Sequence, residues 1–328
     1  MVETLKIGIV GTGGMGSVHF NNYQHIEGCQ VVGLVGVPGN GQSQAERWGV
    51  TYYESIPEMV NAEKLDLVDV CTPTYLHKTH CMQALEAGAN VITEKPIALH
   101  LADAEEMYAL AERMGMLLFV GQVLQFSREI EILHELVNSQ RFGRVLDAYF
   151  ERLAACPTWI KNGWLFDKEK SGLLPFDLHI HDLDTIVSLF GAPLSFNLTC
   201  SGNSGISYKE HCRFIYQYAD HSVAAEAAWF NANFPFTARW RIYFERAVVV
   251  NDEKGLIAYP AQAEPIVFDT EEKEKIPTGI NLPPTGMFKA ELSHYLECVR
   301  RREPSQRVSK DQVLTVVGIL EKIVESID

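Results

Sequence analysis

The feature that most constrains this chain is a glycine-rich turn near its start. An apolar run, Leu5–Val10, is followed at once by Gly-Thr-Gly-Gly-Met-Gly, after which a helical pattern begins. Strand, G-x-G-x-x-G turn and helix together form the dinucleotide-binding unit of doubly wound α/β folds. Gly11 permits the tight turn, Gly13 lets the backbone approach a diphosphate, and Gly16 lets helix and strand pack closely. The amino end of the helix favours phosphate, so we predict nucleotide contacts at Gly11, Gly13, Gly14, Met15 and Gly16. The alternative is a purely structural turn.

Short apolar runs alternate with helical patterns up to Gly121. This alternation implies parallel strands joined by helical crossovers, and therefore a doubly wound Rossmann domain over residues 1–122. The expected strands are Leu5–Val10, Gln30–Gly36, Leu67–Cys71, Asn90–Thr93 and Leu117–Gly121. The expected helices are Met15–Ile26, Gln42–Trp48, Tyr75–Ala87 and Leu101–Met114.

After Gly121 the chain changes to consecutive strands with a few helices. Trp240, Ile242 and Phe244 alternate with polar neighbours, which indicates a sheet with one buried face. We predict an α+β domain with a mostly antiparallel sheet over residues 123–328. Its expected strands are Val145–Leu153, Ser195–Cys200, His211–Tyr218, Ser222–Phe230, Thr237–Phe244 and Ala247–Asn251. Its expected helices are Ser127–Ser139, Leu178–Phe190, Met287–Arg302 and Lys310–Ser326.

Charge and cysteine usage exclude several classes of protein. The 328 residues carry 42 acidic and 28 basic side chains, a net charge of −14. Such a charge opposes non-specific binding to nucleic acids and anionic membranes. No apolar run reaches the ~18 residues of a membrane span, and no export signal is recognisable. Seven scattered cysteines without a C-x-x-C pair indicate neither a disulfide framework nor a zinc site. We expect a cytoplasmic protein without a metal site.

The cofactor's ribose is expected near the end of the second strand, where an acidic residue would bind the 2′-hydroxyl of NAD. Gly36 occupies that position, followed by Val37 and Pro38. Gly36 removes repulsion against the 2′-phosphate of NADP, but the nearest basic residue on that side is Arg47. The sequence leaves NAD and NADP open.

Two motifs follow expected strands of the first domain, Thr72-Pro73 with His77 and Glu94-Lys95-Pro96. Open α/β sheets place their ligand crevice at these strand ends. A lysine beside a nicotinamide can bond a substrate hydroxyl and stabilise a developing alkoxide. The Lys95–Pro96 bond can be cis, which would fix the direction of the lysine. The alternative for Lys95 is a solvated surface charge.

In the second domain a run of acidic and imidazole side chains extends from Asp177 to Asp184. On a helix, Asp177 and His181 share a face, so the carboxylate can orient the imidazole as a general base. The alternatives are a capped helix start and, on an extended segment, a metal site that includes His179. On a helix, His179 and His181 point apart, which disfavours that metal site. Aromatic and polar side chains upstream (Trp159, Lys161, Asn162 and Trp164) suit a polyhydroxylated ring, or else form a packed loop.

Together these motifs resemble the glucose–fructose oxidoreductase/inositol dehydrogenase/rhizopine catabolism (Gfo/Idh/MocA) family. The resemblance rests on the glycine turn, Thr72–His77, Ala84–Gly88, Glu94-Lys95-Pro96 and Asp177–Asp184. It implies a Rossmann domain followed by an α+β domain with a large open-faced sheet, acting on sugars or cyclitols with NAD(P). It also implies a homodimer or homotetramer formed through that sheet, whose uncovered face we expect to be apolar.

The resemblance assigns roles to individual residues. Lys95, Asp177 and His181 match the family's catalytic lysine, aspartate and histidine. Thr72, Pro73 and His77 match the family's cofactor-side loop, and Gln122 matches a position near the nicotinamide. Beyond the resemblance, we expect further cofactor contacts at Gly36, Glu94 and Lys95. We expect substrate contacts at Lys95, Gln122, Trp159, Lys161, Trp164, His179 and His181. This chain departs from the family pattern at Gly36, at Gln125, where an arginine often precedes Phe126, and at His179, where a small residue is common and the imidazole would narrow the pocket.

The sequence thus predicts hydride transfer between nicotinamide and a sugar-like alcohol. His181 would move the hydroxyl proton, Asp177 would hold the imidazole, and Lys95 would bond the reacting oxygen. Two alternatives stay open: glycoside cleavage through transient oxidation, and a non-catalytic dinucleotide sensor. The partner is in each case a small molecule and not a nucleic acid or a membrane.

Overall fold

The computed structural model describes residues 4–158 and 160–327, which form two compact units. Unit 1 comprises the chain up to Phe126 together with Glu272–Val317. Unit 2 comprises Ser127–Glu271 and the chain from Gly318 onward. The chain therefore enters unit 1 twice, whereas the sequence analysis places a single boundary at residue 122.

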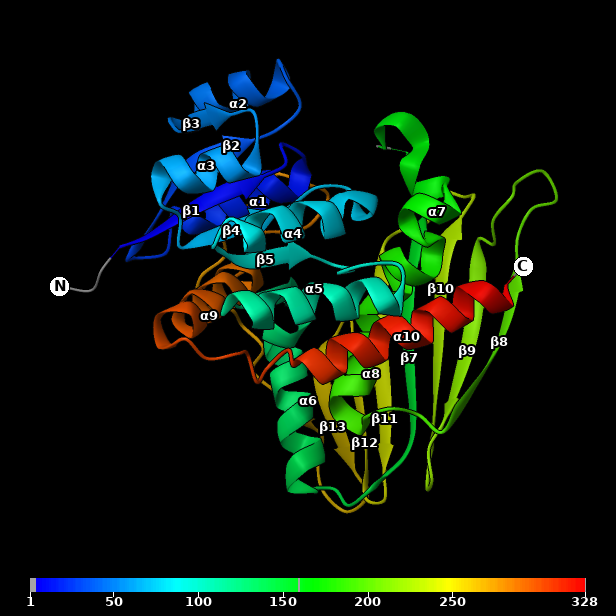
Figure 1. Ribbon diagram of the computed structural model, residues 1–328. Coiled ribbons are helices and arrows are strands. Elements are labelled where there is room, and N and C mark those ends of the chain that lie inside the picture. Colours follow the sequence, from blue (N-terminus) through cyan, green and yellow to red (C-terminus); the bar gives the residue numbers. More distant parts are fainter. Residues whose placement is uncertain (1–3, 159, 328) are drawn as a thin grey trace. The chain divides into compact units, whose positions relative to one another are not determined.

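Unit 1 is built on a parallel sheet with the strand order β3-β2-β1-β4-β5-β6 (Figure 1). This is the order of a dinucleotide-binding Rossmann domain, as predicted. Several strands are buried along their whole length, as expected for a parallel sheet covered on both faces. The strands are β1 (Leu5–Val10), β2 (Cys29–Val35), β3 (Thr51–Tyr53), β4 (Leu67–Val70), β5 (Asn90–Glu94) and β6 (Leu118–Gly121).

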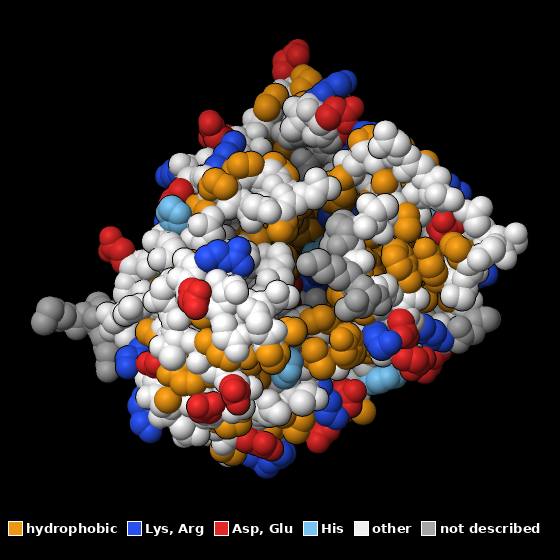
Figure 2. Space-filling model, turned by 90° about the horizontal axis from the view of Figure 1, so that it is seen from above, with side chains coloured by type: hydrophobic (Ala, Val, Ile, Leu, Met, Phe, Trp, Pro, Cys, Tyr) orange, Lys and Arg blue, Asp and Glu red, His pale blue; other side chains and the backbone are white. Residues whose placement is uncertain are grey.

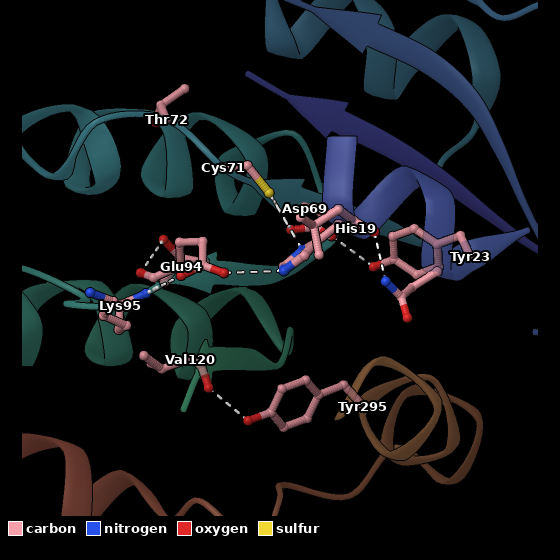
Figure 3. Close-up of polar contacts among 12 residues, drawn as sticks. His19, Tyr23, Asp69, Cys71, Thr72, Glu94, Lys95, Val120 and Tyr295 are labelled. Carbon is pink, nitrogen blue, oxygen red and sulfur yellow. Dashed lines mark hydrogen bonds and ion pairs between the residues drawn. The ribbon is translucent and has the colours of Figure 1, made fainter. Parts of the chain in front are cut away.

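The sequence analysis missed two neighbouring elements of unit 1, the strand β3 and the helix α3 that follows it. The 3₁₀ turn η1 (Thr74–Leu76) leads into α4, and η2 (Val123–Phe126) follows β6. From the returning segment, the Tyr295 hydroxyl of α9 donates to the Val120 carbonyl oxygen at 2.7 Å (Figure 3). The helices are α1 (Gly14–Tyr23), α2 (Asn40–Trp48), α3 (Ile56–Glu63), α4 (His77–Glu86), α5 (Leu101–Met114) and α9 (Met287–Arg301).

Unit 2 contains a mostly antiparallel sheet with the order β14-β13-β12-β11-β7-β10-β9-β8 (Figure 1). Among the described strand pairs of this sheet, only the pair of β7 and β10 is parallel. The strands are β7 (Val145–Ala155), β8 (Ser195–Ser201), β9 (His211–Gln217), β10 (Ser222–Phe230), β11 (Thr237–Phe244), β12 (Ala247–Asp252), β13 (Gly255–Pro260) and β14 (Ile266–Val267). The predicted open α+β architecture is confirmed.

One face of this sheet is a core and the other is polar. The alternation in β11 buries Trp240, Ile242 and Phe244, and α8 (Ile180–Phe190) packs on β7. α6 (Arg128–Ser139) and α7 (Lys168–Ser171) also belong to unit 2, while α10 (Lys310–Ser326) begins in unit 1 and ends in unit 2.

The opposite face carries rows of paired charges. Its ion pairs join Arg213 to Glu226, Arg239 to Glu151 and Arg241 to Asp147. The expectation that the uncovered face is apolar is therefore wrong, because charged side chains make up much of it. Apolar side chains such as Ile215 and Tyr243, each 45% exposed, lie among these charges.

The cysteines also differ from the expectation. Cys200 in β8 and Cys212 in β9 are direct neighbours across the two strands and are joined by a disulfide. The sequence analysis predicted no disulfide, because a cross-strand pairing has no signature in cysteine spacing. The free cysteines of the described chain are Cys29, Cys71, Cys81, Cys156 and Cys298.

On the face drawn in Figure 2, Lys and Arg side chains are scattered among Asp and Glu. Within the described residues, no helix combines the length and the apolar character that a bilayer crossing requires.

Candidate active site

The glycine turn places each glycine in a different environment. Gly11 has φ +116°, and a Cβ there would lie 2.5 Å from the Cys71 carbonyl oxygen. A Cβ on Gly16 would lie 2.3 Å from the Gly11 carbonyl oxygen. A Cβ on Gly13 would meet nothing within 4 Å. Gly11 and Gly16 are thus required by the fold, whereas Gly13 faces open space in which a diphosphate can approach the backbone.

The amino end of α1 fits an anion. Gly13 is the N-cap and offers no side chain to the first-turn N–H groups, and the first turn carries no acidic residue. Met15 packs against a small apolar cluster that includes Val18 and Phe288, which anchors the start of the helix. The unfilled N–H groups and the positive helix end are the donors that a diphosphate needs.

Gly36 directly follows β2, on the side of the turn where the ribose is expected. A Cβ on Gly36 would lie 2.5 Å from Thr12 Cγ2, so the glycine also fits the packing here. Arg47 lies in the last turn of α2, where its Nε donates to the Ser43 carbonyl oxygen at 3.3 Å. The geometry leaves the choice between NAD and NADP open.

The Thr72–His77 loop is tied to the Glu94-Lys95-Pro96 loop by one imidazole. His77 is 1% exposed, and its Nδ1 and Nε2 each lie 2.7 Å from a carbonyl oxygen, of Pro96 and of Thr72 respectively. Burial lowers the pKa of His77, and the two carbonyls oppose this. His77 therefore connects the two loops through the backbone. Pro73 precedes η1, and the Thr72 hydroxyl contacts His80 Nδ1 at 3.0 Å.

Lys95 stands directly after β5 at the carboxyl edge of the sheet (Figure 3). Its peptide bond to Pro96 is cis, and its side chain is half-buried. The Lys95 backbone N–H donates to Glu94 Oε2 at 3.1 Å. Gln122 follows β6, the neighbouring strand, and is 3% exposed.

Behind Glu94 lies a buried polar network that the sequence analysis missed (Figure 3). His19 of α1 contacts Asp69 of β4 at 2.8 Å and Glu94 at 3.1 Å. Tyr23 and Cys71 also contact Asp69. His19, Asp69 and Cys71 are residue types that ligate metals and lie close together, but donor–acceptor pairs at hydrogen-bond distance account for their grouping. The signal available in the sequence was Asp69, a lone carboxylate inside an apolar strand, which needs a buried partner.

In unit 2 the expected helix begins with a π-helical turn. This turn, η4 (Pro175–His179), contains Asp177, and α8 begins directly after it. The Ile180 N–H donates to the Pro175 carbonyl oxygen, five residues back. The predicted spacing of Asp177 and His181 on a regular α-helix therefore needs correction, because the turn between them is wider. Such π turns occur frequently at functional sites.

His179 lies in the core of unit 2. It is 0% exposed, its ring stacks on Phe214 with centroids 3.9 Å apart, and its Nε2 lies 2.6 Å from the Tyr216 hydroxyl. Burial lowers the pKa of His179 to about 3. This position speaks against the expected substrate contact and supports a packing role for His179.

The remaining expected substrate residues are described in part. Trp159 lies outside the described residues, and the side chain of Lys161 is not among those described. Trp164 is half-buried in the 3₁₀ turn η3 (Lys161–Phe166). The expected cofactor residues together with Lys95 belong to unit 1, and Asp177 and His181 belong to unit 2.

Comparison with protein families gives matches for both parts of the chain. A family model described as "Oxidoreductase family, NAD-binding Rossmann fold" matches residues 5–122. A second model, "GFO/IDH/MocA C-terminal domain", matches residues 130–250. The first match includes the glycine turn and Lys95, and the second includes Asp177 and His181.

Characterised relatives are similar over part of their length. A 2,7-anhydro-N-acetylneuraminate hydratase of Mediterraneibacter gnavus is 32% identical over 190 residues, covering 58% of this chain and 50% of the relative. A glucose-6-phosphate 3-dehydrogenase of Bacillus subtilis is 29% identical over 212 residues, covering 62% and 59%. The chain thus spans between half and three fifths of these relatives' length.

Solved structures share the fold over nearly the whole chain. An aldose–aldose oxidoreductase from Caulobacter crescentus superimposes with a TM-score of 0.85 at 21% identity, covering 99% of this chain and 97% of that one. A levoglucosan dehydrogenase in complex with NADH and levoglucosan gives 0.84 at 18% identity, with the same coverage. At these identities the likeness concerns the fold alone.

Proposed function

The chain belongs to the Gfo/Idh/MocA oxidoreductase family, and we propose that it transfers a hydride between a nicotinamide cofactor and a secondary alcohol or ketone of a sugar, cyclitol or related polyol. The observation that carries the proposal is a shared sheet edge. The neighbouring parallel strands β1, β4 and β5 end at Val10, Val70 and Glu94, and the glycine turn and both loop motifs leave from these ends. Ligands of open α/β sheets bind at that edge. When bound, the nicotinamide supplies or accepts the hydride.

The protein's own groups would handle the proton and the charge. In oxidation, His181 takes the proton from the reacting hydroxyl, and in reduction it returns it. Asp177 holds the imidazole and favours its protonated form, while Lys95 donates a hydrogen bond to the reacting oxygen. A positioned acid or base contributes about 10²–10⁴-fold in rate. Gln122, Lys161 and Trp164 are proposed substrate contacts, and their amide, amine and aromatic groups suit a hydroxylated ring.

The test is a panel of sugars and cyclitols followed by nicotinamide absorbance, with NAD and NADP supplied separately. We expect Lys95→Ala and His181→Ala to lose turnover by at least about 100-fold while retaining cofactor binding. Lys78→Ala serves as the matched control, because Lys78 pairs at the surface with Asp103 and Glu106. Undiminished turnover in both variants would remove these residues from the chemistry. Cofactor binding without turnover on any substrate would favour a sensor.

A second candidate is a reaction without net oxidation. The observation that favours it is the similarity to a relative named 2,7-anhydro-N-acetylneuraminate hydratase. In such a reaction the substrate is oxidised transiently, a neighbouring C–H becomes acidic, and the leaving group departs before the hydride returns. Product formation without accumulation of reduced cofactor distinguishes this candidate from a dehydrogenase.

We also propose that two or four copies of the chain associate through the exposed face of the unit 2 sheet. The charged rows on this face contain both signs, which suits self-association in which arginines of one copy meet carboxylates of another. Light scattering at micromolar concentration measures the mass. A charge reversal at Arg239 and Arg241 should yield monomers, and a monomeric wild-type protein would contradict the proposal.

A further inference from the structure

A single buried imidazole lies between two carboxylates beneath the Lys95 loop (Figure 3). His19 is 0% exposed. Its Nδ1 is 2.8 Å from Asp69 Oδ2, and its Nε2 is 3.1 Å from Glu94 Oε1. The three residues come from α1, β4 and β5, so the ring connects the helix of the glycine turn to the strand that ends at Glu94.

The contacts around Asp69 fix the protonation of the ring. Asp69 accepts from the Tyr23 hydroxyl at 2.9 Å and from the Cys71 thiol at 3.3 Å. Burial raises the pKa of both of these donors, so they keep their protons. Burial, the largest single influence, lowers the pKa of His19, but the contacts with Asp69 and Cys71 together outweigh it and raise that pKa well above the usual range. His19 is therefore an imidazolium facing a carboxylate on each side.

Glu94 is held at both of its oxygens. Oε1 faces His19 Nε2, and Oε2 accepts the Lys95 backbone N–H at 3.1 Å. Gly121 of β6 lies beside Glu94, since a Cβ there would be in ordinary van der Waals contact with Glu94 Oε1, at 3.4 Å. The charged or titratable groups that face Glu94 are His19, Lys95, Cys71 and His77.

We propose that His19 is a positioning residue for Lys95: its imidazolium holds the Glu94 carboxylate, which fixes the backbone from which the Lys95 amine projects. The role of Lys95 in turnover rests on the proposed function, but its coupling to His19 does not. A residue that only filled space at position 19 would not need two carboxylate partners. Because His19 lies on α1, the coupling also connects the helix of the glycine turn to the Lys95 loop.

The experiment measures the Lys95 amine directly and needs no substrate. Lysine amines are methylated to a trace extent with formaldehyde and a borane at a series of pH values from about 7 to 10. Mass spectrometry then measures the extent of methylation, which gives the apparent pKa of each lysine amine. Lys78 in the same sample is the internal reference. The variants are His19→Asn, which keeps a donor to Asp69 but cannot reach Glu94, Glu94→Gln, and the double variant.

In His19→Asn, the Glu94 carboxylate loses its buried cation and acts more strongly on Lys95. We expect the apparent pKa of Lys95 to rise by about half a unit or more, while that of Lys78 stays unchanged. In the Glu94→Gln background, the same substitution at position 19 should produce no further shift, because the carboxylate that couples the two sites is gone. Tyr23→Phe loosens Asp69 but leaves the ring–Glu94 contact, so its Lys95 profile should match the wild type.

A folded His19→Asn protein with a wild-type Lys95 profile would overturn the proposal, and so would an equal shift in the presence and absence of the Glu94 carboxylate. If His19→Asn does not fold, Glu94→Gln removes the same contact from its more exposed end, and an unchanged Lys95 profile there also overturns it. Titration of NADH by protein fluorescence in each variant reports cofactor binding separately. A failure of the oxidoreductase assignment therefore leaves this test intact.

Discussion

His77 Nδ1 lies 2.7 Å from the Pro96 carbonyl oxygen, which connects two loops that are nineteen residues apart in the chain. The other ring nitrogen lies 2.7 Å from the Thr72 carbonyl oxygen. A protonated ring would donate to both oxygens and a neutral ring to one. The ring thus holds the two strand-end loops at a fixed separation, which a cofactor lying across them requires.

Removing this link should weaken cofactor binding more than it weakens the fold. We expect His77→Ala to raise the dissociation constant for the cofactor about tenfold, since the loss of one or two buried hydrogen bonds costs about 1–3 kcal/mol. Fluorescence titration measures the constant. His80→Ala is the matched control, because the contact of His80 with the Thr72 hydroxyl does not involve the Pro96 loop. Equal losses in the two variants would show that spanning the loops is not what matters.

The glycine turn allows binding and folding to be separated. Gly13→Ala meets no atom within 4 Å, so we expect a normal melting temperature but at least tenfold weaker cofactor binding. Gly16→Ala would bring a Cβ to 2.3 Å from the Gly11 carbonyl oxygen and should lower the melting temperature itself. Calorimetry and fluorescence titration on the same samples check both expectations. Tight binding by Gly13→Ala would place the diphosphate elsewhere.

Cofactor preference can be tested at Gly36 with a matched pair. Gly36→Asp and Gly36→Asn place the same steric load against Thr12 and differ in charge. The aspartate repels a 2′-phosphate and accepts a bond from a 2′-hydroxyl. We expect the ratio of NADP to NAD dissociation constants to be about tenfold higher in the aspartate variant than in the asparagine variant. An equal ratio in both would mean that the ribose does not lie beside residue 36.

Acid stability should depend on His179. Its pKa in the folded protein, about 3, lies below the ordinary value of 6.5. Between these two pH values the unfolded chain binds a proton at His179 that the folded protein does not bind. Stability is therefore complete above about pH 6.5 and falls as the pH drops toward 3, by up to about 4 kcal/mol from this group. His179→Gln, which cannot titrate, should flatten this slope in urea unfolding, whereas His25→Gln at an exposed position should not. Parallel slopes in wild type and His179→Gln would exclude the effect.

Local patterns predicted most of the fold. Strands such as β1 and β10 and helices such as α5 and α10 were expected at the bounds that the structure has, because each shows a strong apolar period. β3 and α3 were missed since β3 has three residues and α3 has eight, too short for a clear period. Their local signals were the Ser55 cap, which accepts the Glu58 N–H, and the proline that follows it.

The candidate site divides in the same way. Motifs that act through the backbone, such as the glycine turn, consist of consecutive residues and can therefore be recognised in the sequence. The His19 network joins positions 50 and 75 residues apart, so no spacing rule marks it. His179 was assigned to a pocket by its place in a motif. The π turn before α8 and the stacking of His179 on Phe214 depend on the three-dimensional structure, so the motif does not reveal them.

The return of Glu272–Val317 to unit 1 bears on how the protein can be dissected. A fragment cut after residue 122 would lose Tyr295 of α9, whose ring stacks on Phe119 and whose hydroxyl donates to the Val120 carbonyl oxygen. Residues 127–271 are therefore an insertion within the chain of unit 1. A shortened protein that is meant to keep unit 1 intact should replace this insertion with a linker and retain the segment that follows it.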